Sequence, residues 1–302
     1  MTRTAESIPN LSDRRFVVTG ANSGIGLETT RELARAGATV VMACRSRDRA
    51  EAAAGEIYAD VGHADLVIES LDLASLESIR SFAAELDGTV DVLVNNAGVM
   101  GIPRGETEDG FEKQLGINHL GHFVLTAHLS DQLAADGRVV TVSSAMHERG
   151  QIDFGDLHSR HSYGPWEAYS QSKLANVLFA RELQRRFEAA GTDQRSLAVH
   201  PGYADTDLQP RVARAKGSRI QLGMMWAANA VFAQPASMGA LPTLYAATAP
   251  DVNGGGYYGP GGLLNMRGYP ERQEPSKRAQ NPKTAKRLWD VSEGETDIDF
   301  SL

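Results

Sequence analysis

The residues best suited to chemistry are a tyrosine and a lysine four positions apart, Tyr169 and Lys173. Four residues make about one helical turn, so both side chains would leave the same face of a helix. A free phenol has a pKa near ~10, and a neighbouring ammonium group favours the phenolate and lowers that pKa. Such a pair can work as a general acid or base. The simpler alternative is that the two are only neighbours on a helix surface.

The sequence around Tyr169 predicts the elements that position the pair. Apolar residues recur at a helical spacing as far as Ala190, and Gly191 is a typical helix stop. We therefore expect a long, rigid helix. Residues 145–165, just before it, are loop-rich, and we expect them to overhang the pair and cover a substrate.

The overall composition narrows the class of protein. The chain has 302 residues, is 42% hydrophobic and carries a formal net charge of -8, which suits a single domain over residues 1–302. This charge argues against a general nucleic-acid or anionic-membrane surface. Cys44 is the only cysteine, so no intramolecular disulfide can form and we expect a cytoplasmic location. No stretch reaches the ~18 to 20 apolar residues of a membrane span, so we expect no membrane anchor.

Near the N-terminus the sequence reads as a strand over residues 15–20, a glycine-rich loop and a helix to about residue 36. Glycine allows the backbone to turn tightly and approach a ligand, and the start of the helix offers free N–H groups to phosphate. Many such turns need glycine for geometry alone, but between a strand and a helix the pattern favours dinucleotide binding. The residues expected to contact the dinucleotide are Gly20, Asn22, Ser23, Gly24, Ile25 and Gly26.

The next predicted strand, residues 38–43, bears on the choice of dinucleotide. In this type of fold an acidic residue at its end would bind the ribose 2′-hydroxyl of NAD. Here the chain has Cys44 and Arg45 instead, and a guanidinium group suits a 2′-phosphate. NADP is therefore favoured. Alternatively Arg45 is simply solvated, and Arg47 could share or replace its role.

Strands and helices alternate along the rest of the chain, which predicts an α/β fold with a Rossmann-type, doubly wound parallel sheet. Ligands of such sheets lie at the carboxyl ends of the strands. Predicted strands 90–94 and 138–142 end there in Asn95 and in Ser143-Ser144. These residues are therefore candidates for the site.

A predicted helix over residues 111–129 carries Asn118 near its middle, where a polar side chain is unusual. Its three histidines, His119, His122 and His128, match no metal-ligand spacing. We interpret them as structural and expect no metal site.

The C-terminal third is harder to interpret. Residues 203–233 are expected to cover the substrate, and residues 254–262 to form the last strand and turn. Residues 282–291 are expected to form a final helix. The acidic residues 293–302 are expected to be a flexible tail.

Taken in order, these motifs resemble the classical short-chain dehydrogenase/reductase family over roughly residues 14–262. The closest likeness is to its retinol-dehydrogenase-like and WW-domain-oxidoreductase-like branch, because of the segments 43–45, 118–123 and 172–178. The family motifs are TGxxxGIG at Thr19 to Gly26, NNAG at Asn95 to Gly98, the helix Asn118, the serine of Val142-Ser143-Ser144, YxxxK at Tyr169 and Lys173, and Pro201-Gly202.

The resemblance implies hydride transfer between a nicotinamide and a carbonyl or alcohol of a lipophilic small molecule. Tyr169 would exchange the proton, and Ser144, rather than Ser143, would bind the substrate oxygen. Lys173 would lower the pKa of Tyr169 and bind the nicotinamide ribose. Asn118 would hold a water that links Lys173 to solvent. An alternative with the same fold is reduction of a carbon–carbon double bond, and a further one is an NADPH sensor without turnover.

The resemblance also implies the cofactor contacts, which fall mostly within residues 14–200, the expected cofactor-binding core. The adenine would lie beside Asp72 and Leu73, the adenosine ribose beside Asn95, Ala97 and Gly98, and the nicotinamide beside Pro201, Gly202 and Thr206. Subunits of the family often pair through the tyrosine helix and its neighbour. Self-association stays open here, because the long loop of residues 145–165 before Tyr169 could block this pairing.

Overall fold

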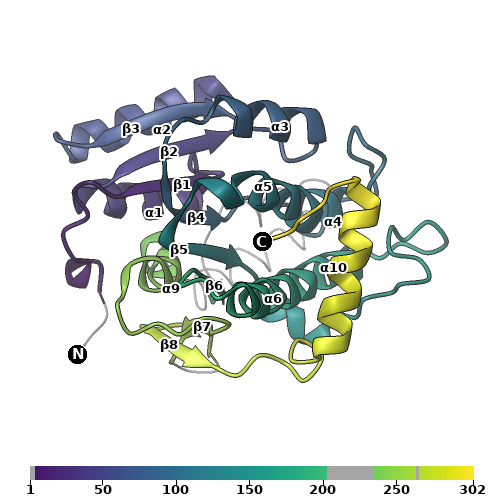
Figure 1. The fold of residues 1–302 in the computed structure, drawn as a ribbon. Helices are drawn as coiled ribbons and strands as arrows, with labels where there is room; N and C mark the ends of the chain where they lie inside the picture. The colour runs from purple at the N-terminus through teal and green to yellow at the C-terminus, as the bar shows by residue number, and fades with distance from the viewer. Residues whose placement is uncertain (1–3, 203–233, 263–264) are drawn as a thin grey trace, which may run out of the picture.

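The computed structural model describes residues 4–202, 234–262 and 265–302 of the chain. Within them lies an eight-stranded sheet with the strand order β3-β2-β1-β4-β5-β6-β7-β8 (Figure 1). Neighbouring strands are parallel except for β7 and β8, which are antiparallel. The strand order reverses between β1 and β4, and ligands of such sheets bind at the carboxyl ends of the strands beside this reversal. The predicted Rossmann-type α/β fold is confirmed.

The elements follow the predicted alternation of strands and helices. The strands are β1 (Arg15–Thr19), β2 (Thr39–Cys44), β3 (Asp65–Ser70), β4 (Val90–Asn95), β5 (Leu133–Val142), β6 (Arg195–Val199), β7 (Tyr257–Pro260) and β8 (Pro270–Gln273). The helices are α1 (Gly24–Arg35), α2 (Arg47–Asp60), α3 (Leu76–Glu85), α4 (Lys113–Leu115), α5 (Gly121–Leu129), α6 (Pro165–Ala190), α9 (Ala236–Thr248) and α10 (Pro282–Thr296).

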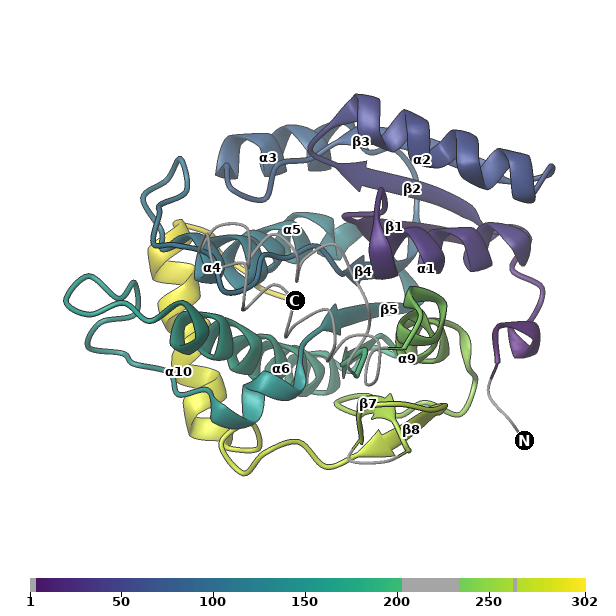
Figure 2. The same ribbon diagram turned by 180° about the vertical axis from the view of Figure 1, so that it is seen from behind.

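The middle of the sheet is apolar on both faces, as expected for a parallel sheet covered by helices. Val17 pairs with Val41 and Leu93, and all three are fully buried on one face. The next residue of β1, Val18, belongs to the other face. Helices α3, α5 and α6 cover the first face (Figure 1), and α1, α2 and α9 cover the second (Figure 2). Among the described residues no helix is both long and apolar enough to cross a membrane.

Three elements differ from the sequence prediction. The helix expected over residues 111–129 is broken into α4, a π-helical segment Gly116–Leu120, and α5. Strand β5 begins at Leu133, five residues earlier than expected. Strand β8 was not predicted, because its sequence Pro-Glu-Arg-Gln has no apolar alternation, and it pairs with β7 as an edge strand.

The C-terminal end is packed in this structure, whereas a flexible tail was expected over residues 293–302. Helix α10 continues to Thr296, and Phe300 beyond it is 1% exposed. The centroid of the Phe300 ring lies 4.6 Å from that of Trp289 and 5.4 Å from that of Phe123. The acidic residues around Phe300 suggested a solvated tail. The burial of the Phe300 ring outweighs the entropic cost of ordering this short segment.

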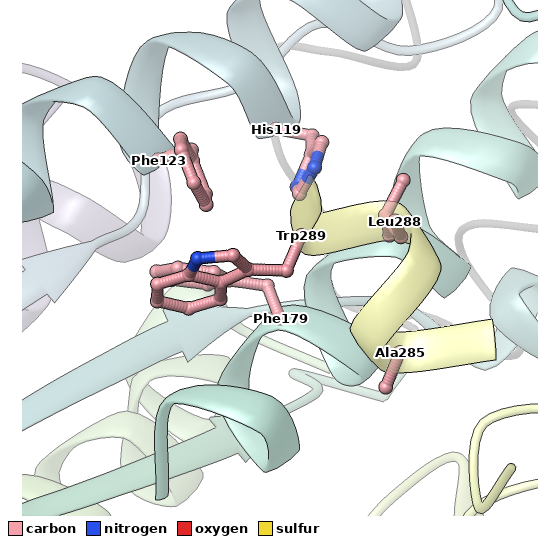
Figure 3. A pocket seen from close by; sticks show the side chains of 6 residues that line it. All are labelled: His119, Phe123, Phe179, Ala285, Leu288 and Trp289. Carbon is pink, nitrogen blue, oxygen red and sulfur yellow. The ribbon is translucent and has the colours of Figure 1, made fainter. Parts of the chain in front are cut away.

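Trp289 holds α10 against α5 and α6. Figure 3 shows its indole beside the rings of Phe123 and Phe179. The ring centroids lie 4.9 Å from Phe123, edge to face, and 5.8 Å from Phe179, stacked. The Arg186 guanidinium lies 4.1 Å from the centroid of the indole. Helix α10 thus covers α5 and α6 around Phe123 and Phe179.

We expect Trp289→Ala to lower the free energy of unfolding by about 3–5 kcal/mol, because it removes a fully buried aromatic side chain and leaves a cavity between three helices. Urea unfolding followed by circular dichroism measures this. Trp166→Ala is the matched control, since Trp166 is 38% exposed. A loss below about 1 kcal/mol for Trp289→Ala would contradict the anchoring role.

Candidate active site

Tyr169 and Lys173 lie on the buried side of α6, so the surface-neighbour alternative is wrong. The helix starts at Pro165 and ends at Gly191, whose φ of +71° gives the left-handed stop that favours glycine. The Lys173 ammonium lies 5.8 Å from the centroid of the Tyr169 ring. Lys173 Nζ also donates a 3.0 Å hydrogen bond to the carbonyl of Val142, the last residue of β5. The pair therefore lies at the carboxyl edge of the sheet.

Burial dominates the electrostatics of the pair. It raises the pKa of Tyr169 to about 12, although a hydrogen bond with Ser144 acts in the opposite direction. It lowers the pKa of Lys173 to about 8. The expected lowering of the Tyr169 pKa by Lys173 is therefore not found in this structure, because both groups are removed from water. Tyr169 keeps its proton at neutral pH and suits the role of a proton donor.

The two adjacent serines are used differently. Ser143 is buried and donates a 2.7 Å hydrogen bond to the carbonyl of Lys173, which ties β5 to α6. Ser144 hydrogen bonds to Tyr169 and begins the 3₁₀ turn Ala145–Arg149. Its Oγ accepts the Met146 N–H at 3.2 Å, which leaves the hydroxyl hydrogen able to donate. Of the two, only Ser144 is placed to hold an oxygen beside Tyr169.

His147, in the turn after Ser144, is a residue that sequence reasoning missed. It is buried, and its Nε2 accepts the Ser276 N–H at 3.1 Å. Its Nδ1 must then carry the proton, and it donates to the Ser144 carbonyl at 2.8 Å. His147 thus fastens the main chain of Ser144 to the C-terminal part of the chain. The only signal in the sequence was a histidine three residues after the serine.

Asn118 lies inside the π-helical segment, a feature often found at functional sites. Its Nδ2 donates to the Val99 carbonyl and to Ser172 Oγ, both at 2.9 Å. Its Oδ1 accepts the Val99 N–H at 2.8 Å. A Cβ added to Gly98 would lie 3.0 Å from this Oδ1 and 3.6 Å from Lys173 Nζ. The Asn118 amide therefore fastens the turn at Gly98 to α6, directly beside the lysine.

The glycine loop has the geometry that the sequence predicted. Gly20 and Gly24 adopt φ values of +67° and +54°, which favour glycine. A Cβ on Gly26 would collide with the Gly20 carbonyl, so α1 packs closely on the loop. Ser23 precedes α1 and makes no side-chain capping bond to the first turn. Its hydroxyl and the first N–H groups of α1, with Asn22 and Ile25 in the same turn, form a donor set suited to phosphate.

The NNAG turn is hydrogen bonded to the start of the glycine loop. The Asn95 side chain is buried and donates to Thr126 Oγ1 of α5 at 3.0 Å. Asn96, which was not among the predicted contacts, donates to the Thr19 carbonyl at 2.7 Å. Ala97 donates its N–H to Thr19 Oγ1 at 2.9 Å. These hydrogen bonds hold the turn against Thr19, the last residue of β1.

Arg45 and Asp72 lie together at the ends of neighbouring strands. The Arg45 side chain is 67% exposed, and its Nε lies 4.0 Å from Asp72 Oδ2. Leu73, the next residue, is buried. Arg47 instead donates to Glu51 of its own helix at 2.9 Å. The guanidinium of Arg45 is the one that extends from the end of β2 next to Asp72.

Two of the remaining predicted residues, Pro201 and Gly202, lie just after the carboxyl end of β6. Pro201 follows β6, and its carbonyl accepts from Gln234 Nε2 at 2.9 Å. Gly202 has a φ of +69°. Thr206 and the expected substrate cover 203–233 lie outside the described residues. No group of three or more metal-ligating side chains gathers within the described ranges.

The comparisons with known proteins agree with this arrangement. The sequence pattern of the family "short chain dehydrogenase" matches residues 14–217. Human (Homo sapiens) retinol dehydrogenase 12 is 43% identical over 289 residues, covering 93% of this chain and 86% of that protein.

Two solved structures are also similar. An uncharacterised protein from Mycobacterium paratuberculosis is 44% identical, covers both chains completely and has a TM-score of 0.84. An NAD(P)-dependent gluconate 5-dehydrogenase from Beutenbergia cavernae with bound NADP is 30% identical, covers 79% of this chain and 91% of its own, and has a TM-score of 0.59. The motifs, the sheet and these relatives together show that this chain belongs to the short-chain dehydrogenase family, in its retinol-dehydrogenase-like branch.

Proposed function

We propose that this chain is an NADP(H)-dependent oxidoreductase that transfers a hydride between the nicotinamide and a carbonyl or alcohol of a lipophilic small molecule. Family membership makes it a nicotinamide-dependent oxidoreductase. The observation that carries the finer proposal is the meeting of Tyr169, Ser144 and Lys173 at the carboxyl end of β5. A cytoplasmic location stays a prediction from the sequence.

The described side chains support a division of labour in the reducing direction. The nicotinamide, when bound, supplies the hydride. Tyr169 donates its proton to the carbonyl oxygen, since its raised pKa keeps it protonated at neutral pH. Ser144 donates a hydrogen bond to the same oxygen, with its Oγ fixed by the Met146 N–H. Lys173 binds the nicotinamide ribose and stabilises the phenolate left on Tyr169.

Two positions fit the charged parts of the cofactor. Ser23 and the start of α1 offer N–H and hydroxyl donors to the pyrophosphate. Arg45 offers an exposed guanidinium where an NAD enzyme would place a carboxylate, beside Asp72 at the adenosine end. Asn118 hydrogen bonds to Val99 and to Ser172, and it thereby positions the turn at Gly98 beside Lys173.

The proposed substrate class is supported by the names of the relatives and by the segments expected to cover the substrate. Human retinol dehydrogenase 12 is named for a lipophilic alcohol. We assign the cover of the substrate to residues 145–165 and 203–233. The first of these is anchored next to the site, because Gln171 of α6 accepts the Asp153 N–H at 2.8 Å and donates to the Leu157 carbonyl at 3.0 Å.

The cofactor assignment is tested by titrating the protein with NADPH and NADH while nicotinamide fluorescence is followed. We expect Arg45→Asp to weaken NADPH binding by about 10-fold or more and to improve NADH binding, because one charge-assisted contact is replaced by repulsion. Arg47→Asp is the matched control and should change NADPH binding far less. Equal affinities of the wild type for both nucleotides, unchanged in Arg45→Asp, would rule out Arg45 as the selecting residue.

A further inference from the structure

His122 lies one turn after Asn118 and is buried at the start of α5. It belongs to none of the catalytic positions described above. The inference below concerns this residue, and its catalytic half rests on the proposed function.

His122 connects two parts of the site that are far apart in sequence. Its Nδ1 lies 3.1 Å from the main-chain oxygen of Asn118. Its Nε2 lies 2.9 Å from Oγ1 of Thr19, the last residue of β1. The same Oγ1 accepts the N–H groups of Asn96 and Ala97, each at 2.9 Å.

The network fixes the tautomer of His122. A hydroxyl oxygen has two lone pairs and one hydrogen, and the two N–H donors occupy both lone pairs of Thr19 Oγ1. The Thr19 hydroxyl must therefore donate, and its nearest acceptors are His122 Nε2 at 2.9 Å and the Val94 carbonyl at 3.3 Å. With Nε2 as the acceptor, Nδ1 carries the proton and donates to Asn118. Both ring nitrogens are then satisfied.

The charge state agrees with this assignment. Burial lowers the pKa of His122 to about 3 and outweighs the hydrogen bond to Asn118, which acts in the opposite direction; the positive charge of Lys173 adds a smaller lowering. A protonated imidazole would also leave the Thr19 hydroxyl with only the Val94 carbonyl, at 3.3 Å, as an acceptor. The ring therefore stays neutral, and the network keeps one arrangement across the working pH range.

We propose that His122 is a positioning residue that locks the main chain of Asn118 to the cofactor-binding loops. On one side it orients the Thr19 hydroxyl, on which the Asn96–Ala97 turn rests. On the other side it holds the main-chain carbonyl of Asn118, whose side-chain amide hydrogen bonds to Val99 and Ser172 next to Lys173. The two ring nitrogens thus serve two tasks: Nε2 supports the cofactor side and Nδ1 supports the catalytic side.

Two substitutions separate these tasks. An asparagine amide places an N–H donor near the position of Nδ1 but is too short to reach Thr19. A glutamine reaches Thr19 with an acceptor oxygen but has no donor near Asn118. We expect His122→Asn to weaken NADPH binding about 10-fold and to leave kcat nearly unchanged. We expect His122→Gln to lower kcat about 10-fold and to leave NADPH binding nearly unchanged. A 10-fold effect is the scale of one lost hydrogen bond.

His128→Gln is the matched control, since His128 lies near the end of the same helix and should alter neither quantity. A merely structural role predicts a common loss of stability without this split. Equal effects of both His122 variants on NADPH binding and kcat, or no effect of either, would overturn the proposal.

If the His122 variants fail to fold, the same contact is tested from the other side. Thr19→Ser keeps the hydroxyl and should bind NADPH normally, whereas Thr19→Val removes it and should behave like His122→Asn. Equal NADPH binding by these two variants would also overturn the proposal. The NADPH titration needs no substrate. A wild-type chain that binds NADPH but reduces no carbonyl compound would therefore contradict the proposed function, while the binding half of this inference would still be decided.

Discussion

Tyr169→Phe is expected to lower carbonyl reduction by about 10²–10⁴-fold and to leave NADPH binding within about 2-fold of the wild type. The substitution removes only the phenolic oxygen, which is the proposed proton donor and the partner of Ser144. The ring stays packed near Trp166, whose ring centroid lies 6.2 Å away. Loss of turnover with intact NADPH binding would therefore report a chemical role. The measurement is NADPH consumption at saturating carbonyl substrate, beside a fluorescence titration of NADPH.

Tyr245→Phe is the matched control for this experiment. Tyr245 is also a buried tyrosine whose hydroxyl makes a hydrogen bond, at 2.8 Å to Asp251, but it lies in α9 on the opposite face of the sheet. We expect its turnover to match the wild type. If Tyr169→Phe kept more than a tenth of the wild-type rate, another group would have to supply the proton.

Acidification is expected to destabilise the fold steeply below about pH 6.5. Burial lowers the pKa of His119 and of His122 to about 3, and that of His200 to about 4. The unfolded chain takes up protons at these residues as the pH falls through about 6.5, whereas the folded chain does not. Stability is thus complete above this pH and is lost towards pH 4. Each histidine contributes about 1.4 kcal/mol per pH unit, so the three together contribute up to about 4 kcal/mol per pH unit.

Urea unfolding between pH 7.5 and pH 5 measures this slope. His200→Gln should reduce the slope by about 1.4 kcal/mol per pH unit, because one titrating group is removed. The glutamine amide can still bond to Gln273, the partner of His200 at 2.9 Å, so the fold should be kept. His63→Gln is the control, since His63 is exposed and its loss should leave the slope unchanged. A free energy of unfolding that stays constant from pH 7.5 to pH 5.5 would show that these histidines are not buried in neutral form.

Sequence reasoning was most successful where the signal is local. The glycines at 20 and 24 were predicted from a strand–loop–helix pattern, and their left-handed backbone follows from the absence of a side chain. The long helix after Pro165 and its stop at Gly191 were predicted from apolar spacing. These features depend on a few consecutive residues, so the sequence contains nearly all the information about them.

Reasoning from the sequence failed where the environment of a group is built by distant residues. Nothing in the sequence indicated that the Asn95 side chain donates a hydrogen bond to Thr126 of α5. The residues after Glu293 were expected to be flexible from their charge, but Phe300 finds Trp289 and Phe123. Each outcome depends on which helix covers which face of the sheet, and single-sequence patterns do not encode that.

The sequence by itself determined the family, the sheet type and the glycine-rich turn between the first strand and helix, because these follow from residue types at fixed spacings. Only the tertiary structure decided the state of the groups. It set the pKa of Tyr169 above its ordinary value, where the sequence suggested a lower one. It also joined His122 to Thr19. Hydrogen bonding and desolvation depend on the atoms that surround a group, and folding brings those atoms from distant parts of the chain.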